Sequence, residues 1–386
     1  MESGGSFSPF EAFLGDLEAL GVRPVASGGS EYAVIRARTN ARWWLLPLAN
    51  RRAAAAGLGM MQPVSHFASL AWNSAKLAAR FGLHWALGGA RLRLSGSPDL
   101  DGAFEEYAET FAYFTGTDGP HRKTAIQIMG SCGHILGYAK ASREPRIQHF
   151  ISSEADMLGR LAILGLQTAQ VPRVVVIDRD EARTLLVTDT LKTASYSAPR
   201  HLGTAHHAFL DEMAARTSRT GAKETLYRLA CDVETLRGKV SSAWMARFEI
   251  CLTVLREKEA ELPIGLAHGD FTPWNAFVQS GRLYVFDWEY ADRAYPIGYD
   301  HIHFLLAVGG DVPSRELADR IIAELSEARF HGDKDLARHA ALFALLQHAA
   351  FYLRRSVEAG EVVPGFDTES QRGGLIDALS QMVAKP

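Results

Sequence analysis

One short polar turn, together with a carboxylate that follows it, carries the residue types that phosphoryl transfer requires. Asp270 and Asn275 lie in the segment His268-Gly-Asp-Phe-Thr-Pro-Trp-Asn275, and Asp287 ends the apolar run that comes next. In such chemistry one carboxylate orients the attacking hydroxyl and accepts its proton, while an amide oxygen and a second carboxylate hold Mg²⁺ against the nucleotide phosphates. Because Mg²⁺ prefers hard oxygen ligands, Asn275 and Asp287 would suffice on the protein side.

At these residues the chain resembles the aminoglycoside phosphotransferase and choline kinase family, relatives of the protein kinases. The segment from His268 to Asn275 is similar to the family's catalytic loop, and Asp287-Trp-Glu289 stands where protein kinases carry Asp-Phe-Gly. The resemblance covers about residues 105–305. It implies that Asp270 is the catalytic carboxylate, that His268 fixes the loop, and that ATP and Mg²⁺ are the cofactors. Gly269 replaces the Arg of the His-Arg-Asp form, so control through a phosphorylated loop is not implied.

Upstream, three strand-like runs resemble the start of a kinase amino-terminal lobe. They are Thr110–Phe114, Lys123–Met129 and His134–Ala141. The turn Gly116-Thr-Asp-Gly119 would lie over the phosphates, because glycine tolerates positive φ and lets backbone N–H groups approach closely. The turn Gly130–Gly133 is the alternative, and ordinary surface turns remain open for both.

A lysine in the third run and an acidic residue after it form the next candidate pair. Lys140 lies in Tyr138-Ala-Lys-Ala141, and a phosphate plus a carboxylate would give such an internal lysine a reason to be buried. The carboxylate candidate is Glu154, in the first turn of a helix that Ser152 or Ser153 would cap, with Asp156 as its competitor. The alternative is a snorkelling Lys140 and a Glu154 that serves only the helix dipole.

The carboxyl-terminal half carries helical periodicity and one supporting carboxylate. Residues 204–217, 223–238, 243–260, 314–327 and 334–358 have apolar side chains at helical spacing, and a polar, glycine-bearing tail follows. The segment Tyr295-Pro-Ile-Gly-Tyr-Asp300 resembles the family's Asp-Pro-x-x-Asp-Leu segment, in which Asp300 would accept hydrogen bonds from the catalytic-loop backbone. Asp300 could also simply cap the helix that follows, and the two roles are compatible.

Composition indicates an ordinary globular protein. The 386 residues are 47% hydrophobic and 22% charged, with a formal net charge of −3, which gives no overall footprint for nucleic acid or an anionic membrane. The three cysteines are scattered and suggest a reducing compartment. The N-terminus does not read as a signal peptide, and no apolar stretch is long enough to span a membrane, so we expect a cytoplasmic protein.

The predicted fold class is α+β, a protein-kinase-like two-lobed fold with an extra N-terminal α/β block. We expect the block at residues 1–97 with no assigned role, a small antiparallel-sheet lobe that binds the nucleotide at 98–191, and a larger, mostly helical lobe with the catalytic loop and substrate site at 192–386.

The function predicted is ATP- and Mg²⁺-dependent O-phosphorylation of a small hydroxylated molecule, such as an aminoglycoside, a sugar or an amino alcohol. The acceptor is the expected partner, and neither nucleic acid nor a membrane is expected to bind. Three alternatives remain: a nucleotide-binding pseudokinase or scaffold, a protein Ser/Thr kinase, and a metal-dependent hydrolase. The hydrolase would use a cluster of His268, Asp270, Asp287, His301 and His303.

Overall fold

The computed structural model describes two compact units of the chain. The first comprises residues 1–165 and 171–197, and the second comprises residues 166–170 and 198–386. Within them the structure describes residues 9–37, 41–60, 66–83, 89–100, 102–116, 119–193, 199, 201–279, 281–308, 312–360 and 367–384. In this part of the chain no helix is both long and apolar enough to cross a bilayer.

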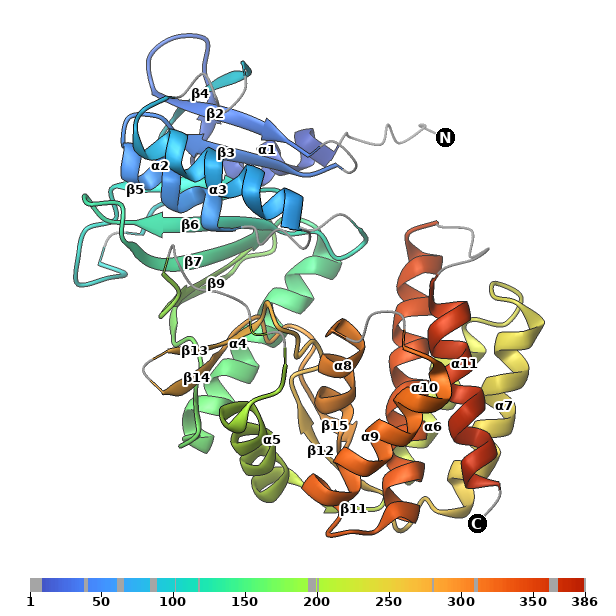
Figure 1. Ribbon diagram of the computed structural model, residues 1–386. Helices are drawn as coiled ribbons and strands as arrows, with labels where there is room; N and C mark the ends of the chain where they lie inside the picture. The colour runs from blue at the N-terminus through green and yellow to red at the C-terminus, as the bar shows by residue number, and fades with distance from the viewer. Residues whose placement is uncertain are drawn as a thin grey trace. The chain divides into compact units, whose positions relative to one another are not determined.

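The first unit is built on one antiparallel sheet of nine strands, in the order β1-β4-β2-β3-β5-β6-β7-β10-β9 (Figure 1). The strands are β1 (Arg23–Pro24), β2 (Ser30–Arg36), β3 (Trp43–Pro47), β4 (Arg91–Ser95), β5 (Thr110–Phe114), β6 (Thr124–Met129), β7 (Ile135–Ser142), β9 (Val174–Arg179) and β10 (Thr184–Asp189). The three predicted runs become β5, β6 and β7, which pair in chain order.

The N-terminal block joins the same sheet through β3. Trp44 pairs with Phe114 across β3 and β5, and their rings stack at a centroid distance of 4.8 Å. Strands from residues 1–97 and from residues 98–191 therefore form one hydrogen-bonded sheet. Whether the two segments have separate functions, as the predicted domain limits suppose, stays a prediction.

Helices cover both faces of this sheet. Helix α1 (Pro9–Ala19) places Phe13 and Leu17 against one face, together with Tyr113 and Ile126. The other face is covered by α2 (Arg51–Gly57), the short η1 (Leu58–Met60), α3 (His66–Arg80) and α4 (Pro145–Leu164). Alternate residues of each strand thus face opposite cores, as the pleat requires.

Helix α4 corrects one sequence expectation. It begins at Pro145 and ends at Leu164, and Gly165, whose φ of 63° lies in the left-handed region, caps it. Glu154 therefore lies in the middle of the helix and not in its first turn, and Ser152 is an interior residue. Pro145 occupies the first helical turn, where its missing N–H costs nothing, and this starts the helix earlier than the serines suggested.

The second unit is mostly helical. Its helices are α5 (Thr204–Thr217), α6 (Lys223–Glu234), α7 (Ser242–Glu257), α8 (Tyr299–Val308), α9 (Ser314–Arg329), α10 (Lys334–Glu358) and α11 (Asp367–Val383). The predicted polar tail is wrong, because α11 is a helix that buries Leu375, Ile376 and Leu379 completely in the core.

Short strands of the second unit hold the polar segments that the sequence singles out. They form two sheets, β11 (Arg219–Thr220), β12 (Pro263–Ala267) and β15 (Asp292–Pro296), and β13 (Ala276–Gln279), β14 (Arg282–Val285) and β8 (Ala169–Gln170). The catalytic-loop segment connects β12 to β13, and Asp287 follows β14. The predicted α+β class, with one sheet-rich and one largely helical part, is confirmed.

Candidate active site

The loop between β12 and β13 is fixed from behind by one buried carboxylate. Asp300, 5% exposed at the start of α8, accepts the backbone N–H of His268 at 2.7 Å and that of Gly269 at 3.0 Å. Burial raises the pKa of Asp300, and these two N–H groups act in the opposite direction because they favour the charged form. Asp300 therefore makes the loop contacts that were predicted for it.

His268 closes the loop from its other side. Its Nδ1 accepts the backbone N–H of Asp270 at 3.2 Å, so the ring proton lies on Nε2, which donates to the carbonyl oxygen of Phe286 at 3.0 Å. Both ring nitrogens are thus used by the backbone, and the ring is fully buried. The structure gives His268 a structural contact set, which matches its predicted part in fixing the loop.

Gly269 is the residue that this loop geometry requires. Its φ is 82°, and a Cβ there would lie 2.4 Å from the carbonyl oxygen of Tyr290. Any larger residue would collide with the backbone, in addition to the strain of positive φ. The glycine in place of an arginine is therefore a packing requirement of this chain.

Asp270 and Asn275 face each other inside the loop. The side-chain amide of Asn275 donates to Oδ2 of Asp270 at 2.8 Å and to its backbone carbonyl at 3.0 Å. Because the amide nitrogen is turned toward Asp270, the amide oxygen is the atom that could bind a cation.

Asp287 lies in a strained turn directly after β14. Its φ is 71°, one of two positive values for non-glycine residues among those described. Such conformations cost free energy and gather at functional sites. The indole N–H of buried Trp288 donates to the Val285 carbonyl at 3.0 Å and holds the turn.

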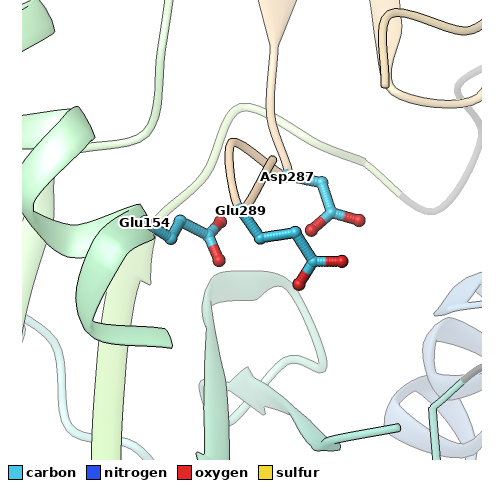
Figure 2. A group of neighbouring side chains, drawn as sticks. All are labelled: Glu154, Asp287 and Glu289. Carbon is cyan, nitrogen blue, oxygen red and sulfur yellow. The ribbon is translucent and has the colours of Figure 1, made fainter. Parts of the chain in front are cut away.

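Glu289 follows in the same turn, and Figure 2 shows its side chain beside that of Asp287. One carboxylate oxygen from each residue lies within 4.8 Å of the other, a spacing that a cation could bridge. Sequence reasoning gave Glu289 no role of its own.

In the first unit, Lys140 and Glu154 form the predicted pair. The Lys140 ammonium lies 2.7 Å from Oε1 and 2.5 Å from Oε2 of Glu154, whose side chain is only 3% exposed. Figure 2 shows Glu154 projecting from α4. The competitor Asp156 instead pairs with Arg179 at 2.5 Å. A strand lysine held by a buried carboxylate is the arrangement that a phosphate-binding lysine needs.

The two glycine turns differ in their surroundings. Gly116 and Gly119 have φ values of 77° and 134°, while Thr117 and Asp118 between them lie outside the described residues. The alternative turn packs against the N-terminal block, since a Cβ on Gly133 would lie 2.6 Å from the Ala53 backbone nitrogen. That contact gives the Gly130–Gly133 turn a structural purpose, and the phosphate-covering role of Gly116 and Gly119 stays a prediction.

A group of aromatic side chains adjoins Asp270, and the sequence did not predict that it belongs to this site. Nε2 of His303 lies 3.3 Å from Oδ1 of Asp270 and 3.5 Å from the hydroxyl of Tyr352. His348 packs edge-on against His303 at 4.8 Å, and burial lowers its pKa well below the ordinary value, which keeps it neutral. Burial, with the nearby charge of Asp270, raises the pKa of Tyr352 to about 12. One side of the Asp270 carboxylate is thus bounded by the rings of His303, His348 and Tyr352.

The hydrolase alternative fits this geometry poorly. His268 is committed to backbone groups, and Nε2 of His301 lies 2.9 Å from Glu324 on α9. Among the residues described, the five side chains of that cluster do not converge on one point as metal ligands do. The hard oxygen donors Asn275 and Asp287 suit Mg²⁺ better than zinc.

Comparisons with known proteins agree with this interpretation. The sequence profile described as the phosphotransferase enzyme family matches residues 141–342, just over half of the chain. A search of curated proteins found no significant match.

Among solved structures, wild-type aminoglycoside 2'-phosphotransferase-IIIa in its GDP complex is similar, with 12% identity, 72% of this chain and 94% of that chain covered, and a TM-score of 0.49. A thermostable mutant of aminoglycoside phosphotransferase APH(4)-Ia is 15% identical, with 72% of this chain and 96% of that chain covered and a TM-score of 0.48. The choline kinase LicA from Streptococcus pneumoniae is 13% identical, with 67% of this chain and 93% of that chain covered and a TM-score of 0.41. At these values the structural likenesses carry no argument of their own.

Proposed function

The chain belongs to the phosphotransferase enzyme family, as its motifs predict, and on that premise we propose that it transfers the γ-phosphoryl group of ATP to a hydroxyl of a small molecule. Phosphotransfer to an alcohol group is the activity that the sequence predicted. The observation that carries the proposal is the loop in which Asp300 anchors the backbone while Asn275 and His303 hold the Asp270 carboxylate.

Each residue has a distinct part in the proposed reaction. Asp270 orients the acceptor hydroxyl and takes its proton as the oxygen attacks phosphorus in line. Lys140, held by Glu154, binds the α- and β-phosphates, and the backbone of Gly116 and Gly119 covers them. His268 and Asp300 keep the loop in place, which lowers the reorganisation that the reaction would otherwise require.

Asn275 and Asp287 would hold Mg²⁺, because an amide oxygen and a carboxylate are donors that this ion accepts. When bound, the ion neutralises charge on the phosphates. Both donor residues come from turns that their own strands fix, so the set would be present before the nucleotide arrives. ATP and Mg²⁺ are available together in the cytoplasm, where we place the activity.

The acceptor class is the broadest part of the proposal. Similar structures were solved as complexes with kanamycin and with spectinomycin, and others are a fructosamine kinase and a choline kinase. The acceptors that the sequence predicted, namely aminoglycosides, sugars and amino alcohols, form the first screening set. A pseudokinase would bind nucleotide without turnover, and a protein kinase would phosphorylate a generic protein substrate.

The test compares Mg²⁺-dependent nucleotide binding and ATP turnover in the wild type, Asp270→Asn and Asp287→Ala. We expect Asp270→Asn to bind nucleotide normally and lose turnover by at least about a hundredfold, the usual range for a positioned acid or base. Asp287→Ala should lose the Mg²⁺ dependence of binding. Asp292→Asn is the matched control, since this exposed carboxylate lies on β15, and its contacts are a 3.5 Å pair with Arg228 and the backbone N–H of Ala294 at 3.2 Å, which an amide oxygen can still accept. Undiminished transfer by Asp270→Asn would refute the assignment.

A further inference from the structure

Helix α3 carries an apolar ridge on its outer side. Leu70, Leu77 and Phe81 are 69%, 57% and 67% exposed, and their spacing of seven and four places them on one line along the helix. The backbone N–H of Phe81 still donates to the Leu77 carbonyl at 3.1 Å, so the helical path continues past Arg80. We call Leu70, Leu77 and Phe81 the α3 ridge.

The opposite side of α3 already has its core contacts. The indole N–H of Trp72 donates to the Leu58 carbonyl at 2.6 Å, its ring meets Trp44 edge-on at 5.6 Å, and Ala79 is fully buried. The ridge is therefore not an unfinished core face of this unit. Large apolar side chains exposed in a row, unlike scattered single ones, indicate a surface that binds something.

The stretch of sequence that contains α3 is also unusual in its charge. Between Tyr32 and Pro98 the sequence has no Asp or Glu, although the whole chain has 44, and it has nine Lys and Arg. This stretch therefore carries a formal charge of +9, and the remainder of the chain carries −12 (32 − 44). The nine are Arg36, Arg38, Arg42, Arg51, Arg52, Lys76, Arg80, Arg91 and Arg93. The net charge of −3 is the sum of these two values, so it conceals the positive charge of the N-terminal block that could attract an anionic membrane.

Part of this positive charge lies at the ridge itself. Arg80 is exposed in the last turn of α3, and the Arg51 side chain lies against the end of the helix, where its Nε would be 2.8 Å from a Cβ on Gly82. Lys76 is half-buried on α3, and burial lowers its pKa. An apolar ridge with arginines beside it, in a stretch of sequence without Asp or Glu, is the pattern of a helix that lies in the plane of a membrane interface.

We propose that the α3 ridge and the arginines beside it dock this protein onto an anionic lipid surface. Leucine and phenylalanine side chains would enter the boundary between headgroups and acyl chains, and the basic side chains would contact the anionic headgroups. This assigns a role to the N-terminal block, and it stands independently of the proposed phosphotransfer, because the ridge precedes the family match at residues 141–342.

Two other occupants fit less well. Nucleic acid would be bound through its phosphates by basic side chains, and exposed leucines would add nothing to that contact. A second copy of the chain, packed ridge to ridge, would bring the Arg80 and Arg51 side chains of both copies together, and like charges at an interface oppose association. An anionic lipid surface uses both the apolar and the basic side chains.

The test is cosedimentation of the full chain with vesicles of phosphatidylcholine alone and with phosphatidylglycerol added. We expect binding to the anionic vesicles, weak binding to the neutral ones, and release near ~1 M salt, where screening shortens the range of charge interactions to about 3 Å. The double variant Leu77→Ser/Phe81→Ser should weaken binding by about tenfold or more for each side chain removed. Arg80→Glu should weaken it at least about fivefold.

Ile163→Ser is the matched control. Ile163 is 90% exposed on α4 of the same unit, so it tests the loss of an exposed apolar side chain away from the ridge. All substituted residues are exposed, and thermal unfolding of each variant checks that the fold is kept.

Several results would overturn the proposal. These are no binding of the wild type to anionic vesicles, undiminished binding by the double variant, or an equal loss in Ile163→Ser. Tight binding to duplex DNA that Arg80→Glu weakens and the double variant leaves intact would assign the face to nucleic acid. A dimer in solution that the double variant dissociates would assign it to self-association.

Discussion

Replacing Asp300 should measure how strongly one buried carboxylate holds the catalytic loop. In Asp300→Ala the backbone N–H groups of His268 and Gly269 lose their acceptor, and both lie in a buried part of the loop. A buried donor without a partner costs about 1–3 kcal/mol, so the two together cost about 2–6 kcal/mol. Burial of the carboxylate is itself unfavourable, as its raised pKa indicates, so removing it recovers part of this cost. We therefore expect the free energy of unfolding to fall by about 2–4 kcal/mol in Asp300→Ala.

Asp300→Asn should fall between the wild type and Asp300→Ala, because the amide oxygen can still accept one of the two N–H groups. Urea-induced unfolding, followed for the second unit, measures the loss as a shift of the transition midpoint. Asp319→Ala is the matched control: this α9 carboxylate is 63% exposed and forms only a 3.5 Å pair with Arg315, so its loss should cost less than about 0.5 kcal/mol. An Asp300→Ala variant as stable as this control would show that the loop does not depend on the two hydrogen bonds.

Two further outcomes follow from side chains of the second unit. His303→Leu should lower kcat about ten- to a hundredfold, the range for one hydrogen bond to a charged group, with little change in the KM for ATP. His303→Gln keeps an N–H donor and should retain most activity. Equal rates for His303→Leu and the wild type would contradict this. The hydrogen bond from His301, with help from Arg320, lowers the pKa of Glu324 to about 2, so Glu324 stabilises the fold fully above its ordinary value of 4.5 and loses that effect as the pH falls toward 2. The difference in unfolding midpoint between the wild type and Glu324→Gln should therefore shrink from pH 6 to pH 3, and a constant difference would be evidence against the pairing.

The site residues that could be predicted are those whose neighbours in sequence are also their neighbours in space. The segment from His268 to Asn275 is short and lies between two strands, so the types and spacing of its residues nearly determine which groups meet. Lys140 and Glu154 were also paired correctly, although the helix start was wrong. The pairing survived this error because a helix interior and a first turn both present a side chain to the adjacent strand.

His303 was missed as a partner of Asp270 because the contact joins a loop and a helix. One signal was nevertheless available. His303 follows Asp300 by three positions, and residues three apart on a helix share a face. Since Asp300 was already predicted to face the loop, His303 had to face it as well. His303 was instead predicted only as a metal ligand of the alternative hydrolase site.

Helix α11 shows a different limit. Its first half, Asp-Thr-Glu-Ser-Gln-Arg-Gly-Gly, has low helix propensity and no apolar periodicity, and this composition indicated a tail. The second half buries Leu375 and Leu379 against the core of the second unit, and this burial stabilises a helix that propensity alone would not. No local rule reports such tertiary stabilisation.

The charge of the N-terminal block, unlike helix α11, could be predicted from the sequence alone. The absence of acidic residues between Tyr32 and Pro98 could be counted from the sequence, but the whole-chain average concealed it. The structure was needed for the complementary observation that Leu70, Leu77 and Phe81 point away from the core while Trp72 points into it. Either feature alone has an ordinary explanation, since basic stretches can be solvated and amphipathic helices usually bury their apolar side. Together they place exposed apolar side chains beside basic ones in a stretch of sequence that has no Asp or Glu, and an anionic interface is the partner that stabilises both.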